Sequence, residues 1–194
     1  SNGNVYGAGV YARTGSNVIF RNCSISKNEV HSKNNFYNNK GGGIYFEGNS
    51  LKIYDSEINN NYITLENDNN GQVHGAGIYM SNGTLYLENS TVSSNKFDSE
   101  DNQNFGGIYS PYHTVEIINS TISNNSDGGI YSGSNSKFTN TTISGNATKG
   151  IYTSDNSTIT NSVISNNTNY GLYVEGSNSS IENTTITYNG TGIY

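Results

Sequence analysis

Two glutamates are the side chains of this sequence that could perform acid–base chemistry as a pair. Glu88 and Glu116 lie in similar short segments, residues 85–88 and 115–118, in which apolar and polar residues alternate. If these segments are strands in neighbouring layers, the two carboxylates lie roughly 8 Å apart, which is within the separation that inverting glycosidases use. The alternative, which we favour, is a solvated strand face with scattered charges.

Metal binding is the second chemistry to consider. His31 and His74 lie in neighbouring segments that interrupt the repeat described below, and His113 lies near Pro111, the only proline. The same interrupting segments carry carboxylates whose oxygens could bind calcium: Glu29, Glu66, Asp68, Asp98, Glu100 and Asp101. Because spacing alone does not make these groups converge, we expect solvated acidic loops and no cofactor, with calcium as the alternative.

The composition excludes several functional classes. The 194 residues carry a formal net charge of −6 and have a sequence pI near 4.9, whereas nucleic-acid binding uses a basic surface. No run of about 18 apolar residues occurs, so we expect no membrane span. A content of 31% hydrophobic residues with 23 glycines would suit a disordered chain, unless the apolar residues recur where a core needs them.

They do recur, in an internal repeat. The tripeptide Gly-apolar-Tyr is separated by steps of 34, 34, 30 and 22 residues and then by three steps of 21, beginning at Gly9, Gly43, Gly77, Gly107, Gly129, Gly150, Gly171 and Gly192. A unit of 21 residues is too short for two helices, and its alternating apolar residues indicate strands. Each unit is therefore predicted to form one coil of three short strands and three bends, stacked about 4.8 Å from the next coil.

Equivalent residues of successive coils should stack into columns. An apolar column is predicted to face the core: Val10, Ile44, Ile78, Ile108, Ile130, Ile151, Leu172 and Ile193. A column of small residues should also face inward: Cys23, Ser56, Ser90, Ser120, Thr141, Ser162 and Thr184. Cys23 is thereby interpreted as a core residue rather than a nucleophile or half of a disulfide.

Two further features belong to the bends. Asparagine columns run from Asn22 to Asn183 and from Asn28 to Asn189, and their amides should hydrogen-bond to the backbone and to one another. The glycine before the apolar column is expected where the backbone conformation or a close approach excludes a Cβ atom.

A tyrosine follows each residue of the apolar column and should point outward, because side chains alternate along a strand. This column contains Tyr11, Tyr45, Tyr79, Tyr109, Tyr131, Tyr152, Tyr173 and Tyr194. Stacked rings contribute about 0.2–1 kcal/mol per cross-strand pair, which is a structural reason for the column. An aromatic strip also suits sugars or a protein partner, so the candidate ligand-binding residues include Tyr45, Tyr79, Tyr109, Tyr131 and Tyr152.

The first three coils are longer than the others. Their extra residues, 29–40, 62–74 and 96–105, fall at the same bend, so three long loops should lie side by side on one edge and form a binding surface. The candidate ligand-binding residues on these loops are His31, Phe36, Tyr37, Glu66, Asp68, His74, Phe97 and Asp101.

Asn-x-Ser/Thr sequons are numerous because the coil pattern itself generates them. Asn82, Asn156 and Asn178 lie at turns outside the strands and are the candidate glycosylation sites.

The patterns Gly-Gly-Ile-Tyr (residues 128–131) and Ile-x-Asn-Ser-Thr-Ile-Ser-x-Asn (residues 117–125) resemble the right-handed parallel β-helix family. That family includes pectate-lyase-like enzymes and surface adhesins, and the chain is most similar to Asn/Thr/Tyr-rich adhesin-like surface proteins of archaea and bacteria. The resemblance covers residues 7–194 and implies an all-β fold, a right-handed single-stranded parallel β-helix of about seven to eight coils. The coil pattern is weak evidence for function, because enzymes and passive stalks share it.

Three functions remain open. We favour a non-catalytic extracellular or cell-surface segment that serves as an adhesin or a stalk and binds glycans or surface proteins. The second function is a polysaccharide lyase or glycoside hydrolase, and the third is a filament subunit that stacks end to end. The last coil has the same apolar residues as the middle coils, so we expect residues 1–194 to be one domain that continues into further β-helix coils of the same or a neighbouring chain.

Overall fold

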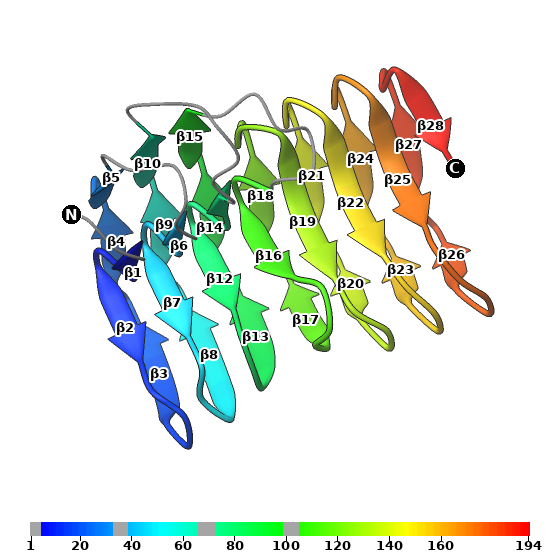
Figure 1. The fold of residues 1–194 in the computed structure, drawn as a ribbon. Coiled ribbons are helices and arrows are strands. Elements are labelled where there is room, and N and C mark those ends of the chain that lie inside the picture. The colour runs from blue at the N-terminus through cyan, green and yellow to red at the C-terminus, as the bar shows by residue number, and fades with distance from the viewer. Residues whose placement is uncertain (1–4, 33–38, 66–72, 99–104) are drawn as a thin grey trace.

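A computed structural model describes residues 5–32, 39–65, 73–98 and 105–194, and all regular elements in these ranges are strands. Each repeat forms one coil of three strands, and equivalent strands of successive coils pair in parallel (Figure 1). The described residues therefore wind around a common core as a parallel β-helix, which confirms the fold predicted from the repeat.

The first long sheet carries the Gly-apolar-Tyr repeats and has eight strands. They are β2 (Val10–Ala12), β7 (Ile44–Phe46), β12 (Ile78–Met80), β16 (Ile108–Ser110), β19 (Gly128–Ser132), β22 (Lys149–Thr153), β25 (Tyr170–Val174) and β28 (Thr191–Ile193). The register aligns the apolar column, since Ile78 pairs with Ile44 on one side and with Ile108 on the other. All three of these isoleucines are fully buried, so the column faces the core here as predicted. At the end of the described chain Ile193 is 53% exposed, so the prediction fails at this member of the column.

Two sheets of seven strands complete the coils. The second sheet contains β3 (Asn17–Arg21), β8 (Ser50–Tyr54), β13 (Thr84–Glu88), β17 (Val115–Ile118), β20 (Lys137–Thr139), β23 (Thr158–Thr160) and β26 (Ser180–Glu182). The third sheet contains β4 (Ser24–Ser26), β9 (Glu57–Asn59), β14 (Thr91–Ser93), β18 (Thr121–Ser123), β21 (Thr142–Ser144), β24 (Val163–Ser165) and β27 (Thr185–Thr187). One apolar cluster, built from all three sheets, runs along the axis.

The bends on either side of the third sheet depend on left-handed backbone conformations. The first asparagine column has φ near 50° throughout, including Asn89 at 49° and Asn119 at 50°. Asparagine tolerates this region better than other residues that carry a Cβ. The residue before the second asparagine column is also left-handed, as in Asn124 at 54°. These conformations let the chain turn within one or two residues.

The second asparagine column forms a buried ladder of hydrogen bonds. The Oδ1 atom of Asn125 accepts from the backbone N–H of Asn95 at 3.0 Å and from its Nδ2 at 3.1 Å. The Nδ2 atom of Asn125 donates to the carbonyl oxygen of Val92 and to Oδ1 of Asn146, both at 3.1 Å. Each amide thus joins three coils, and the same pattern recurs from Asn61 to Asn167.

The glycine column is required by this ladder. A Cβ atom added to Gly129 would lie 2.8 Å from Nδ2 of Asn146 and 2.7 Å from the carbonyl oxygen of Gly150. Real Cβ atoms do not approach other heavy atoms this closely. Close approach, rather than positive φ, therefore explains glycine at this position.

The small column forms a second ladder. The hydroxyl of Ser90 donates to the carbonyl oxygen of Glu88 at 2.7 Å and accepts from the N–H of Ser56 at 3.0 Å. Cys23 takes the same place, with its Sγ 3.2 Å from the carbonyl oxygen of Arg21. Cys23 is a free cysteine in the small column, as predicted.

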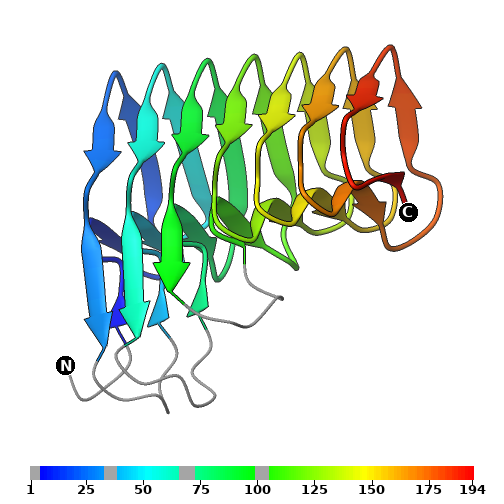
Figure 2. The same cartoon turned by 90° about the horizontal axis from the view of Figure 1, so that it is seen from above.

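The extra residues of the first three coils are not only loops, which corrects our expectation. They form one more parallel sheet of β5 (Glu29–Ser32), β10 (Tyr62–Leu65) and β15 (Lys96–Asp98). They also supply β6 (Asn39–Lys40) and β11 (Val73–His74) to a second one, which β1 (Val5–Tyr6) from before the first coil completes. Figure 2 shows the body extended on one side in the blue to green coils. These strands enclose a second apolar cluster of Val30, Ile63, Val73, Ala76 and Phe97.

A pair of substitutions in the same coil, one on β19 and one on β21, tests this register. Ile130→Asn places an amide without a built partner at a fully buried position and should lower the free energy of unfolding by about 4 kcal/mol. Thr142→Asn changes an exposed position of β21 and should have an effect within about 0.5 kcal/mol. The measurement is urea unfolding followed by circular dichroism, and equal shifts of the two midpoints would contradict the register.

Candidate functional site

The tyrosine column forms a continuous aromatic ladder on the outer face of the first sheet. Consecutive ring centroids are 5.4, 5.2, 5.5, 5.3, 4.4, 4.7 and 4.8 Å apart, from Tyr11 to Tyr194. The backbone register places each tyrosine beside its copies, for example Tyr109 between Tyr79 and Tyr131. The predicted alignment of this column is therefore confirmed.

The ladder is less exposed than the sequence suggested, because a second column covers it. The covering residues come just before the glycine column, and each contacts the tyrosine of the following coil: Tyr6 on Tyr45, Lys40 on Tyr79, His74 on Tyr109, Phe105 on Tyr131, Lys149 on Tyr173 and Tyr170 on Tyr194. Tyr45 is consequently only 5% exposed, whereas Tyr11 is 46% exposed. Tyr45 thus points outward from the sheet, as predicted, but its ring is almost completely covered.

These covering residues were missed by the sequence analysis. They occupy no constant offset from the apolar column, since Lys40 lies four residues before Ile44 and Lys149 lies two before Ile151. The signal that could have found them is an aromatic or basic residue immediately before each glycine-rich bend.

Hydroxyl groups of the ladder donate to carboxylates at two places along it. Tyr11 and Tyr45 donate to the two carboxylate oxygens of Glu47, at 3.1 and 3.0 Å, and Tyr152 donates to Glu175. Burial is the largest cause that raises the pKa of Tyr152, and its hydrogen bond to the Glu175 carboxylate is the second. Burial is also the largest cause that raises the pKa of Tyr109. Proximity to the neighbouring phenols adds to both shifts. The phenols of Tyr109 and Tyr152 are therefore neutral at physiological pH and can act as hydrogen-bond donors.

The insertion residues chosen as ligand-binding candidates have different outcomes. Phe97 is only 7% exposed and belongs to the second apolar cluster, so its assignment to a binding surface is wrong. His74 is buried on β11, and its ring lies 4.2 Å from that of Tyr109, so it belongs to the ladder. The other ligand-binding candidates on the insertions lie outside the described residues, as does the calcium candidate Glu100: Phe36, Tyr37, Glu66, Asp68 and Asp101.

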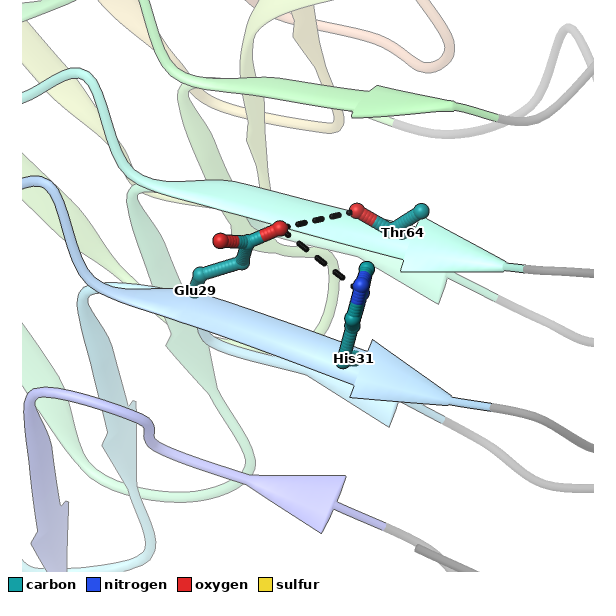
Figure 3. A network of polar contacts seen from close by, with 3 residues as sticks. All are labelled: Glu29, His31 and Thr64. Atoms are coloured by element: carbon teal, nitrogen blue, oxygen red, sulfur yellow. Dashed lines mark hydrogen bonds and ion pairs between the residues drawn. The ribbon is translucent and has the colours of Figure 1, made fainter.

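His31 is the one remaining insertion candidate, and its side chain is exposed on β5. Its Nδ1 atom lies 3.6 Å from Oε1 of Glu29, and the same carboxylate oxygen accepts from the hydroxyl of Thr64 at 3.3 Å (Figure 3). His31 and His74 lie on different sheets. The described residues contain no group of three or more His, Cys, Asp or Glu side chains that could hold a metal ion.

The glutamate pair has the predicted register, because Tyr86 pairs with Glu116 and Glu88 pairs with Ile118. The carboxylate of Glu88 accepts from the hydroxyl of Tyr86 at 2.9 Å. Glu116 lines an open groove of about 410 Å³ together with Lys52 and Tyr86. Burial, followed by the contact with Glu88, raises the pKa of Tyr86 to about 12.

A second groove was not anticipated. It has a volume of about 450 Å³ and crosses the bends between the first and second sheets, where Tyr112, Tyr131, Asp155 and Glu175 line it. Tyr112 departs from the coil pattern, and the sequence signal that could have pointed to this groove is an aromatic residue beside the only proline.

The three candidate glycosylation sites, Asn82, Asn156 and Asn178, are all exposed.

The geometry first defines the class of this protein, a parallel β-helix with an aromatic ladder on one face. A family model described as the right-handed beta helix region matches residues 63–194, which is more than half of the chain. The protein therefore belongs to the right-handed β-helix family. No curated protein and no solved structure matches the chain. The described part of the chain contains no helix with the length and hydropathy that a membrane crossing requires.

The raised tyrosine pKa values predict how stability depends on pH. A tyrosine whose pKa is higher in the folded state than its usual value of about 10 stabilises the fold below that pH, and this contribution is lost as the pH rises through the folded-state pKa. The shifts of Tyr45, Tyr86, Tyr109, Tyr131 and Tyr152 all have this direction. The free energy of unfolding should therefore fall steadily above about pH 10, measured by denaturant titration at each pH.

Tyr109→Phe is the control for this prediction. The substitution keeps the ring and removes one ionisable hydroxyl, so it should make the alkaline loss of stability smaller. Lys149 should contribute the opposite pH dependence of stability, because burial lowers its pKa. Its single contribution should be smaller than the sum of those of the several tyrosines. Stability that stays constant or rises up to about pH 12 would contradict the neutral ladder.

Proposed function

We propose that this chain is a non-catalytic segment of an extracellular or cell-surface β-helix whose tyrosine face binds glycans or surface proteins. The observation that carries this proposal is the tyrosine ladder, which runs along the first sheet from Tyr11 of β2 to Tyr194, the residue after β28. The core needs only the apolar residue before each tyrosine, so a smaller outward residue would satisfy the fold. A phenol in every coil therefore supplies more than the core requires.

The chemistry of the ladder suits such contacts. The rings, some stacked and some tilted or edge-on, offer apolar area, and their hydroxyl groups can donate to and accept from a ligand. Lys40 and Lys149 lie against rings, with Nζ 4.7 Å from the centroid of Tyr79 and 5.2 Å from that of Tyr152. The face thus combines aromatic area with a few fixed charges, which supports binding more directly than catalysis.

The surface composition supports an extracellular location for the proposed function. The candidate glycosylation sites are exposed at bends, where an attached sugar would not disturb a ladder. A chain rich in Asn, Ser and Thr with a single cysteine in the small column needs no disulfides, because its stacked hydrogen bonds already join the coils.

A carbohydrate-active enzyme is the alternative, and one observation favours it. Lys52, Tyr86 and Glu116 meet in a groove on the second sheet, and these are residue types that can move protons. Glu88, however, is held by the hydroxyl of Tyr86. In the following coils Lys137 pairs with Glu116 and Ile118 pairs with Glu88, so neither glutamate has another carboxylate beside it at the same position of the next coil.

The proposal predicts binding without cleavage. Purified protein incubated with polygalacturonate or alginate, with and without calcium, should release no new reducing ends and no unsaturated products. The same preparation should bind sugars or surface proteins on an array, and Tyr131→Ser with Tyr152→Ser should weaken that binding. Product release that is lost in Glu88→Gln or Glu116→Gln would show an enzyme instead.

A further inference from the structure

The groove that crosses the bends between the first and second sheets has the features of a ligand site. It runs over the bends of four successive coils, from the bend after β16 to the bend after β25, and has a volume of about 450 Å³. This volume lies in the range of small-molecule sites, about 300–1,000 Å³. Tyr112 and Tyr131 supply its aromatic surface, and Asp155 and Glu175 supply its charges.

The bend that carries Tyr112 is fixed from both sides. His113 lies 3.1 Å from the carbonyl oxygen of Ser81 through its Nε2 atom, and its own carbonyl oxygen accepts from the N–H of Gly133 at 3.1 Å. Pro111 restricts the backbone before Tyr112. A Cβ atom at Gly133 would lie 2.7 Å from the nitrogen of His113, so the neighbouring coil packs closely against this bend.

This rigid bend presents an aromatic ring to solvent. Tyr112 is 88% exposed, the highest value among the large exposed hydrophobic residues of the described chain. Because the backbone that carries this ring is already fixed, a ligand that covers the ring orders only its side-chain torsions. Tyr112 is therefore suited to stack against a flat apolar face.

The carboxylates on the other side of the groove are held in place as hydrogen-bond acceptors. Oδ1 of Asp155 accepts from the N–H of Ser177 at 2.7 Å, and Glu175 accepts from the hydroxyl of Tyr152. No basic residue is among those that line the groove, all of which are described. The nearby Lys149 instead lies over the rings of Tyr152 and Tyr173. The groove is thus negative, with fixed acceptors facing an aromatic ring.

We infer that this groove binds the uncharged rings of a neutral polysaccharide, with Tyr112 stacking on the apolar face of a sugar and Asp155 and Glu175 accepting from its hydroxyl groups. This inference rests on the proposed glycan-binding function and names its ligand class. Sugar hydroxyls are donors that pair well with carboxylates. Uronic acids are disfavoured, because their carboxylates would face Asp155 and Glu175, no basic residue lines the groove, and the charge of the nearby Lys149 already acts on Glu175.

The test is isothermal titration calorimetry of the whole chain with cellohexaose, mannohexaose, xylohexaose and hexagalacturonate. At least one neutral hexasaccharide should bind, and hexagalacturonate should not. Tyr112→Ala should weaken the binding about tenfold, whereas Tyr112→Phe should retain it. Asp155→Asn combined with Glu175→Gln should admit hexagalacturonate, because the amides remove both negative charges.

Tyr188→Ala is the matched control, because Tyr188 is 84% exposed and lies away from the groove. This variant should bind like the unchanged protein. Equal sugar affinities of Tyr112→Ala and Tyr188→Ala would show that the groove is not the sugar site and would leave the tyrosine ladder as the candidate binding face. Binding of hexagalacturonate as tight as that of the neutral sugars, or no binding of any neutral sugar, would also overturn the inference.

Discussion

The buried asparagine column is the interaction on which the rest of the structure depends. An amide inside the coil is costly unless both its oxygen and its nitrogen are paired, and here the partners are the same amide one coil away and the backbone of neighbouring coils. Each coil is therefore satisfied only when its neighbours have the same register. The ladder also occupies the space beside Gly129 and its equivalents, which couples the asparagine and glycine columns.

The position of the aromatic face follows from that coupling. Because the glycine adjacent to the ladder is followed at once by the core isoleucine and then by tyrosine, fixing the ladder fixes each ring outward and beside its copies. The strands supply a spacing of about 4.8 Å, and the ring centroids of the ladder lie within about an ångström of it. The aromatic face is thus positioned by the core without a separate framework.

The repeat allowed most of the fold to be predicted from the sequence, whereas the sites were predicted only in part. Columns such as Ile44 to Ile151 could be predicted because each coil repeats the same constraint. Phe97 was misassigned because the longer coils form a second core, whose residues do not follow the 21-residue pattern. The groove beside Tyr112 was missed for a related reason, since its aromatic wall comes from a bend that departs from the pattern.

The most direct test of this account is a comparison of Asn125→Asp with Asn119→Asp by urea unfolding. Asn125→Asp keeps the shape of a buried side chain but removes its two donated hydrogen bonds and buries a charge, so it should cost about 3–5 kcal/mol. Asn119→Asp lies in the exposed column, where Asp55 already occurs, and should change stability by less than about 1 kcal/mol. Equal stabilities of the two variants would contradict the central role of the asparagine ladder.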